Sequence, residues 1–235
     1  MFKDFAEASA FVSANGVRMV DLKFSDLWGR WHHVTISAQE FKPALMKAGV
    51  GLDGSSVGLK SVKSGDMALI PDLSTGSMDP FCEVPTLSFF CNTIEADTKQ
   101  LFPSDPREIN RRAEAFLVSS GIADESRWGP EFEFYIFNHV SFENGINVAS
   151  YSVDSVEANW HNVQGGHGHF IPIHGGYHAI PPKDQLYNIR SKMSVTLEEM
   201  GIPVKYHHHE VGGPGQCEIE TPLMKLLPAC DASMM

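Results

Sequence analysis

The alternating segment 131–136 constrains the fold more than any other part of the sequence. Gly129 and Pro130 end whatever precedes it, and Glu131 and Glu133 then alternate with apolar residues. This is the period-2 pattern of a strand with one apolar face. On the other face, two carboxylates about 7 Å apart repel each other by roughly 2 kcal/mol at an effective dielectric constant near 20. Hard divalent cations are the usual compensation, so the segment predicts a metal-binding strand.

A second acidic pair lies downstream in a predicted hairpin. Residues 204–211 read as a strand that ends in Glu210, residues 212–215 as a turn, and residues 216–221 as the returning strand, which carries Glu218. We therefore expect Glu210 and Glu218 to face each other across the hairpin. Four carboxylates on neighbouring strands would form a pocket for one or two Mg²⁺ or Mn²⁺ ions. The alternative is that these are solvated glutamates on exposed strands.

Composition excludes several classes of protein. The chain has 235 residues, of which 43% are hydrophobic and 20% charged, as in ordinary globular domains. A net charge of −11 argues against nucleic acid as a partner. Apolar runs are too short to span a membrane, and the N-terminus lacks the apolar core of a signal peptide, so we expect a cytoplasmic protein. The four cysteines lack metal-binding spacing and are expected to be buried free thiols, with a disulfide as the less favoured alternative.

Two domains are predicted, over residues 15–99 and 106–235. A short helix at 4–14 precedes the first domain, which is expected to be a small mixed sheet with one crossing helix. Its predicted elements are strands at 17–24, 31–36, 67–70 and 84–90 and a helix at 39–47.

The second predicted domain begins with a helix at 107–119, which Asp105 can cap and Pro106 can start. A helix at 183–200 carries an apolar stripe, including Ile189 and Met193, that we expect to face a core. Residues 138–182 have little periodicity and are predicted to be a long functional loop. Residues 226–235 read as a helix that has just begun, so we expect the chain to be the N-terminal part of a longer protein.

Several motifs in one order carry a resemblance to a known family. They are Asp53-Gly54-Ser55-Ser56, Gly129-Pro130-Glu131-Phe132-Glu133-Phe134, Gly175-Gly176-Tyr177, and His207-His208-His209-Glu210 followed by Gly215-Gln216-Cys217-Glu218. In order and spacing they resemble the bacterial class I glutamine synthetases over essentially the whole chain. The resemblance implies an α+β fold, with an N-terminal β-grasp domain followed by part of a catalytic domain that has a curved antiparallel sheet.

The same resemblance implies an ATP-dependent glutamate–ammonia ligase that makes glutamine through a γ-glutamyl phosphate. Glu133, Glu210 and Glu218 resemble the ligands of the metal on the substrate side. Glu131 resembles one ligand of a second metal that carries the nucleotide phosphates, and the other ligands of that metal would lie beyond residue 235. The implied partners are glutamate, ammonium and ATP, with Mg²⁺ or Mn²⁺. The implied assembly is a homo-oligomer, a dodecamer of two hexameric rings whose active sites are shared between subunits.

Further residues acquire roles through the resemblance. Asp53 resembles the aspartate that reaches a neighbouring subunit's cleft and takes a proton from ammonium, and Tyr177 resembles a residue that lines the ammonium site. Lys205 and the run from Thr221 to Leu223 fall where the family contacts ATP. The sequence also departs from the family there, because the family usually has Glu where Lys205 stands and an aromatic residue where Leu223 stands.

Other departures lie near the first motif and in the long predicted loop. The turn after Ser56 is about one residue short, and Leu59 replaces an aromatic residue that packs near the nucleotide in the family. The run 164–178 also differs in detail from the usual loop. Of the functions that the resemblance implies, nucleotide binding is therefore the one for which the residues of this chain differ most from those of the family.

Three alternatives stay open. The first is a γ-glutamyl ligase that uses an organic amine instead of ammonium. The second is a truncated, non-catalytic relative, and we expect the isolated 235-residue chain to make no glutamine. The third is a zinc site, because His207 and His209 share a strand face and His167 and His169 could join them, as histidines do in zinc enzymes.

Overall fold

The computed structural model describes residues 2–161 and 168–235. By its internal contacts the chain forms two compact units. Unit 1 comprises Met1–Trp128, Glu199–Gly201 and Leu223–Met235, and unit 2 comprises Gly129–Glu198 and Ile202–Pro222. Among the helices of the described residues, none combines the length and apolar character that a membrane span needs.

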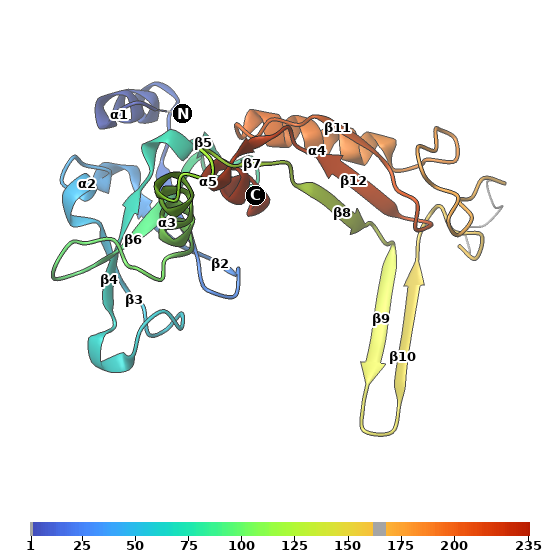
Figure 1. Ribbon diagram of the computed structural model, residues 1–235. Coiled ribbons are helices and arrows are strands. Elements are labelled where there is room, and N and C mark those ends of the chain that lie inside the picture. Colours follow the sequence, from blue (N-terminus) through green and yellow to red (C-terminus); the bar gives the residue numbers. More distant parts are fainter. Residues whose placement is uncertain (1, 162–167) are drawn as a thin grey trace. The chain divides into compact units, whose positions relative to one another are not determined.

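Unit 1 is built on a mixed sheet (Figure 1). Its α-helices are α1 (Phe5–Ala14), α2 (Leu45–Ala48), α3 (Pro106–Ser119) and α5 (Leu226–Ser233). Its strands are β1 (Met19–Ser25), β2 (Trp31–Ser37), β3 (Val50–Asp53), β4 (Asp66–Pro71), β5 (Ser77–Met78), β6 (Thr86–Glu95), β7 (Arg127–Trp128) and β13 (Met224–Lys225). Short 3₁₀ helices are η1 (Ala38–Glu40), η2 (Val62–Ser64) and η3 (Leu73–Thr75).

The strands of the main sheet run in the order β2-β1-β6-β4-β3, with β5 beside β6. Strand β1 pairs parallel with β6 and antiparallel with β2, and the remaining neighbours pair antiparallel. The predicted hairpin of the first two strands is therefore present, with Met19 opposite Ser37 and Ser25 opposite Trp31. The small mixed sheet expected for this part of the chain is confirmed.

The core of unit 1 is apolar and draws on the sheet and on α1. Val20, Leu22, Leu69 and Leu87 are fully buried. Helix α1 begins at a cap, because the Asp4 side chain accepts a hydrogen bond from the Glu7 amide. Aromatic contacts extend this core, with ring centroids 6.1 Å apart for Phe2 and Phe89, 5.6 Å for Phe41 and Phe89, and 5.1 Å for Phe2 and Phe11. Burying such side chains stabilises a domain by about 1.5–3 kcal/mol each.

Two expectations for unit 1 need correction. The predicted helix at 39–47 is wrong: η1 and the four-residue α2 stand there, because Pro43 lacks an amide proton and disfavours helical geometry at Lys42. Helix α3 begins as expected, since the Asp105 side chain accepts from the Arg107 amide. The sequence also predicts an apolar stripe of Ile109, Ala113, Phe116 and Leu117 on this helix, but Ile109 is 45% and Phe116 is 72% exposed.

The buried residue of α3 is instead a charged one. The Arg107 guanidinium donates to both carboxylate oxygens of Asp231 at 2.9 Å, to Asp72 at 2.8 Å and to the side-chain oxygen of Asn92 at 2.6 Å. Burial alone would lower the pKa of Arg107, but these acidic partners outweigh it and raise the pKa. An ion-pair network therefore fixes α3 within unit 1.

Unit 2 contains β8 (Glu131–Tyr135), β9 (His139–Asn144), β10 (Ala149–Asp154), α4 (Tyr187–Glu199), β11 (Tyr206–His209) and β12 (Gln216–Glu220). Its antiparallel sheet has the order β11-β12-β8, and β9 and β10 pair as a separate hairpin, drawn in yellow in Figure 1. This α+β arrangement, with an antiparallel sheet after the mixed one, agrees with the predicted fold class.

The long loop predicted at 138–182 is wrong for its first part, because β9 and β10 lie there. The sequence does carry a strand signal here that the prediction missed, because Val140 and Phe142, and then Ala149, Tyr151 and Val153, alternate with polar residues. Both faces of the hairpin are nevertheless largely exposed.

Helix α4 also differs from the expectation, because Ile189 and Met193 are exposed while Arg190 and Ser194 are buried. The predicted core stripe of α4 is therefore wrong for those two residues. The cysteines of the chain are free, as expected, although Cys82 is exposed rather than buried.

Candidate active site

Strand register gathers carboxylates on one face of the sheet in unit 2. Strands β8 and β12 pair antiparallel, with Glu133 opposite Glu218 and Glu131 opposite Glu220. Residues directly opposite each other point to the same face of a sheet. The alternating segment that dominates the sequence therefore meets a second alternating segment, and four glutamates share one face.

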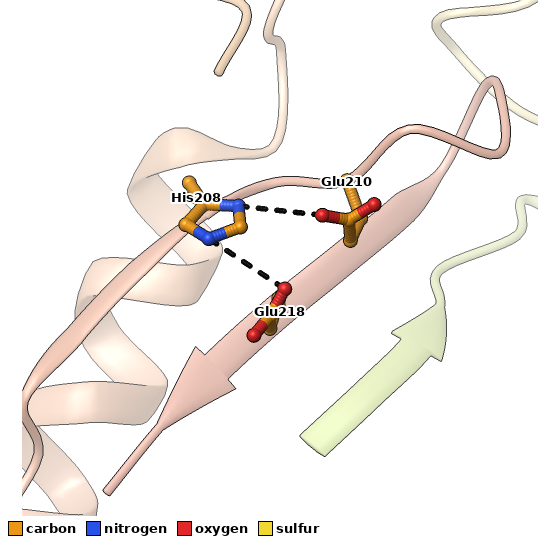
Figure 2. Close-up of side chains that lie close together, drawn as sticks. All are labelled: His208, Glu210 and Glu218. Atoms are coloured by element: carbon orange, nitrogen blue, oxygen red, sulfur yellow. Dashed lines mark ion pairs between the residues drawn. The ribbon is translucent and has the colours of Figure 1, made fainter. Parts of the chain in front are cut away.

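Strand β11 adds His208 opposite Glu218, and Glu210 follows directly after this strand. The expectation that Glu210 faces Glu218 across the hairpin thus needs refinement, because the residue opposite Glu218 is His208. Figure 2 shows the His208 ring between the two carboxylates, with Nδ1 4.0 Å from Glu210 and Nε2 3.5 Å from Glu218. One ligand atom from each of these three residues lies within 4.8 Å of the others.

A second group has the same compactness. Ligand atoms of Glu131, Glu218 and Glu220 also lie within 4.8 Å of one another. Glu218 belongs to both groups, and Glu218 and Glu220 are each only 7% exposed. The structure therefore brings Glu210 close to Glu218 in one group and Glu131 close to Glu218 in the other. Glu133 lies opposite Glu218 and accepts a hydrogen bond from the Gln216 amide group at 2.9 Å, but it belongs to neither group of the described residues.

The electrostatics of this face fit a hard cation. Burial raises the pKa of Glu218, and the neighbouring charges of Glu210, Glu131 and Glu133 raise it further, against the opposing effect of His208. Carboxylate oxygens are the ligands that Mg²⁺ and Mn²⁺ prefer. The donor set of this chain therefore fits a divalent cation, which would relieve the repulsion among the glutamates.

A buried network behind the sheet fixes the turn between Glu210 and Glu218. Glu157 is fully buried, and its carboxylate accepts from His209 Nε2 and from the Gly215 amide, each at 2.9 Å. Burial alone would lower the pKa of His209, but the hydrogen bond and charge of Glu157 outweigh it and raise the pKa. Glu157 thus connects both ends of the turn.

His207 and His209 occupy the sheet face opposite the glutamates. His207 Nδ1 accepts a hydrogen bond from Arg190 at 3.4 Å, while His209 pairs with Glu157. Among the described residues, neither they nor His169 belong to a compact group of metal-ligating atoms, and His167 lies outside the described residues. The zinc alternative therefore has no geometric support in the part of the chain that the structure describes.

Arg190 anchors α4 on this same side. It is fully buried and donates to Asp184 at 3.0 Å, with Cys217 Sγ 3.6 Å away. Burial by itself would lower the pKa of Arg190, but the hydrogen bond and charge of Asp184 raise it. The buried face of α4 therefore contains the charged Arg190 at a position where an apolar residue is usual.

Asp53 lies in unit 1, at the end of β3. Its carboxylate is exposed and accepts from the Ser55 amide at 2.9 Å and from the Ser56 hydroxyl at 3.0 Å. Hydrogen bonds from Ser55, and then from Ser56, lower the pKa of Asp53. The carboxylate is therefore ionised at neutral pH and can attract a cation.

Tyr177 lies in unit 2, beside the first group of ligands. Its ring centroid is 5.4 Å from that of His208. The preceding Gly176 permits this approach, because a Cβ there would come within 2.4 Å of the His209 ring and 2.5 Å of the Glu210 carbonyl oxygen. The His178 amide also donates to the His209 carbonyl at 3.1 Å. The Gly-Gly-Tyr motif is thus attached to β11.

The three residues predicted to contact ATP lie in different surroundings. Lys205 Nζ is 2.6 Å from the Glu220 carboxylate and 4.8 Å from the centroid of the Tyr206 ring. Thr221 is buried, and its amide and hydroxyl donate to the Pro130 carbonyl at 3.3 and 3.4 Å. Leu223 is exposed and belongs to unit 1. Their role in nucleotide binding stays a prediction.

Sequence reasoning missed three residues of this region: His208 as a neighbour of the acidic pair, Glu220 and Glu157. Alternation along 216–220 places Glu220 on the same face as Glu218, so the period-2 pattern contained a signal for it. No local pattern marks Glu157, because its partners are 28 to 58 residues away in the chain.

Comparison with known proteins shows the family of the chain. A family model described as the glutamine synthetase β-grasp domain matches residues 16–96, and one described as the glutamine synthetase catalytic domain matches residues 103–235. A glutamine synthetase from Methylococcus capsulatus is 43% identical over 224 residues, which are 93% of this chain and 48% of that protein. A relative named 3-hydroxylaminophenol mutase, from Cupriavidus pinatubonensis, is 38% identical over 98% of this chain and 50% of its own length.

Comparison with solved structures shows the same fold in a known protein. A cryo-EM structure of glutamine synthetase from Plasmodium falciparum matches 99% of this chain and 47% of its own, with a TM-score of 0.86 and 22% identity, which shows the fold alone. The chain spans about half the length of the curated relatives it matches. Because the two family models together cover most of its residues, the chain belongs to the glutamine synthetase family.

Proposed function

We propose that this chain forms part of an ATP-dependent glutamate–ammonia ligase that makes glutamine through a γ-glutamyl phosphate. The observation that carries the proposal is the shared face of β8 and β12, where Glu131, Glu133 and Glu218 meet, with Glu210 directly beside them. Membership of the family supports it.

The chemistry explains why such a face is needed. A carboxylate does not release oxide, so amide formation requires a better leaving group, and phosphorylation of the glutamate side chain supplies one. Divalent cations, when bound, provide the positive charge that phosphoryl transfer requires. The carboxylates of Glu131, Glu133, Glu210 and Glu218 would hold these cations. The hydrogen bonds of Glu157 would keep the turn that carries Glu210 in place.

The second step needs neutral ammonia at a pH where ammonium prevails. Asp53 is ionised, because hydrogen bonds from Ser55 and Ser56 lower its pKa, and would bind the ammonium cation. Within the closed cleft it would then accept the proton of ammonium. Tyr177 would line the same site. In this proposal Asp53 serves a neighbouring copy of the chain in a dodecamer, and Lys205 and the run from Thr221 to Leu223 contact ATP.

The domain limits 15–99 and 106–235 and a cytoplasmic location belong to the same proposal. So does the role expected for residues 138–182, of which 162–167 lie outside the described residues: this segment would exclude water from the acyl phosphate. Water would otherwise hydrolyse this intermediate.

Titration with Mn²⁺ tests the metal centre directly. Replacing Glu133 or Glu218 with Gln should weaken Mn²⁺ binding by at least about tenfold, since each change removes a proposed ligand or its charge. Glu143→Gln is the matched control, because Glu143 is an exposed glutamate on β9 of the same unit. Isothermal titration that finds the same affinity in all four proteins would refute the metal assignment.

Activity requires a longer polypeptide in this proposal, because the remaining ligands of the second metal would lie beyond residue 235. The 235-residue chain should give no glutamine with glutamate, ATP and ammonium, whereas a protein that extends over the full length of the relatives should. A screen of that longer protein with organic amines distinguishes ammonium from another acceptor. Measurable γ-glutamyl transfer by the isolated chain would contradict the proposal that activity needs a longer polypeptide.

A further inference from the structure

We propose that Glu220 is an additional ligand of the divalent cation, acting with Glu131 and Glu218 and held in place by Lys205. The inference deepens the proposed ligase, on which it rests only through the carboxylate face of β8 and β12. It makes no use of the substrates.

The position of Glu220 follows from the sheet register. It lies opposite Glu131 and two residues after Glu218, so all three side chains project from the same face. One oxygen from each carboxylate lies within 4.8 Å of the others. That spacing is short enough for a single cation to contact all three, because oxygen ligands lie about 2.0–2.6 Å from Mg²⁺ or Ca²⁺.

One oxygen of Glu220 is left without a partner. Oε1 accepts from Lys205 Nζ at 2.6 Å, and the Tyr206 hydroxyl also lies beside this carboxylate, whereas Oε2 is buried and has no hydrogen-bond partner within 3.5 Å among the described residues. The Glu220 side chain is more than nine-tenths buried. Because buried polar atoms normally have a partner, this orphaned oxygen indicates that a ligand belongs beside it.

Charge bookkeeping indicates what kind of ligand that is. Three carboxylates and the Lys205 ammonium leave a net charge of about −2 at this place, which a single divalent cation would neutralise. Ligating carboxylates commonly bond to a second protein group that orients them. Lys205 would do this for Glu220, which gives the lysine a role beside the metal in addition to the proposed contact with ATP.

The simpler alternative is that Glu220 only pairs with Lys205. Both explanations predict that Glu220→Gln weakens Mn²⁺ binding somewhat, because the change removes a nearby negative charge. They differ for Glu220→Asp, which keeps the charge but withdraws the carboxylate by one methylene. A ligand must keep its position, whereas a distant charge need not.

We would titrate the 235-residue chain with Mn²⁺ and follow free Mn²⁺ by electron paramagnetic resonance. Both Glu220→Gln and Glu220→Asp should weaken one class of Mn²⁺ sites by at least about tenfold. In deuterated water, electron spin echo modulation should show one more water on the bound Mn²⁺ of each variant, which replaces the lost oxygen. Glu143→Gln should match the wild type in both measurements.

Several outcomes would overturn the proposal. Wild-type affinity and hydration in Glu220→Asp would leave Glu220 as a partner of Lys205 only. If Glu218→Gln abolishes binding while both Glu220 variants bind normally, this inference fails and the proposed metal centre stands. If Glu218→Gln also binds normally, the metal centre itself fails. Circular dichroism without metal establishes that each variant is folded, and Glu220→Asp carries the test if Glu220→Gln is not.

Discussion

The mixed sheet of unit 1 and the three-stranded sheet of unit 2 bury different kinds of side chain. In unit 1 most of the fully buried strand positions are apolar, such as Val20, Leu22 and Leu87, although Thr93 on β6 is fully buried as well. In unit 2 every residue of β12 is buried, and its alternate positions are Gln216, Glu218 and Glu220. Burial of apolar side chains stabilises the first sheet. Burial of carboxylates destabilises the second sheet unless the charges are paired, because an unpaired buried charge is costly.

The difference extends to the surroundings of each sheet. The groups that support unit 2 are themselves charged, as in the pairs Arg190–Asp184 and His209–Glu157. Such pairs give little net stability but fix positions, because breaking one leaves an uncompensated charge. We infer that unit 1 is organised for stability and unit 2 for holding charged groups in defined places.

The largest expected effect tests the apolar sheet. Phe89 is 1% exposed and contacts Phe2 and Phe41, so Phe89→Ala should lower the free energy of unfolding by about 4 kcal/mol through lost contacts and a cavity. Urea denaturation measures this loss, which should be the same with and without Mn²⁺. Phe142→Ala is the control, because Phe142 is 80% exposed on β9 and the change should cost less than about 0.5 kcal/mol. A loss from Phe89→Ala that Mn²⁺ restores would contradict the proposed contrast.

The next effect tests the charged support of unit 2. Arg190→Met should cost about 3 kcal/mol, because Asp184 would remain buried without its partner. Adding Asp184→Asn to this variant should recover part of the loss, since no unpaired charge then remains. Lys192→Met, on the exposed side of the same helix, is the matched control and should have little effect. Equal losses from the single and double variants would show that packing, and not charge, decides stability there.

The smallest effect concerns a more peripheral ion pair of unit 1. Lys23 Nζ lies 2.8 Å from Asp79, and although burial alone would raise the pKa of Asp79, hydrogen bonds from Lys23 and the Phe81 amide lower it below 3.8. Asp79→Asn should therefore cost about 1 kcal/mol at neutral pH.

The pH dependence of this pair has a defined sign. A lowered pKa in the folded state contributes stability above the unfolded value of 3.8, and this stability is lost as the pH falls through the lower folded value. The difference between wild type and Asp79→Asn should thus shrink only below 3.8. Urea titrations over that range measure it, and a difference that shrinks already near neutral pH would contradict the assignment.

Local sequence patterns predicted those helices and strands in which the order of apolar and polar residues matches the side chains that the fold buries. The hairpin of β1 and β2 and strand β8 follow from alternation, and the start of α3 follows from Asp105 and Pro106. Strands β9 and β10 carry the same kind of alternation, with Tyr151 opposite Phe142 and Val153 opposite Val140, so the pattern was present in the sequence and the predicted loop overlooked it. The buried side of α4 could not be predicted from a local pattern, since Arg190 is buried only because Asp184 is beside it.

By itself, the sequence determined that paired glutamates lie on strand faces, since a period of two residues fixes which side chains share a face. Only the tertiary structure decided which glutamates meet, because the register places Glu218 between Glu133 and His208 and Glu220 opposite Glu131. A register is set by contacts between distant segments, such as those of Glu157 with His209 and Gly215. Such contacts leave no periodic trace in either segment.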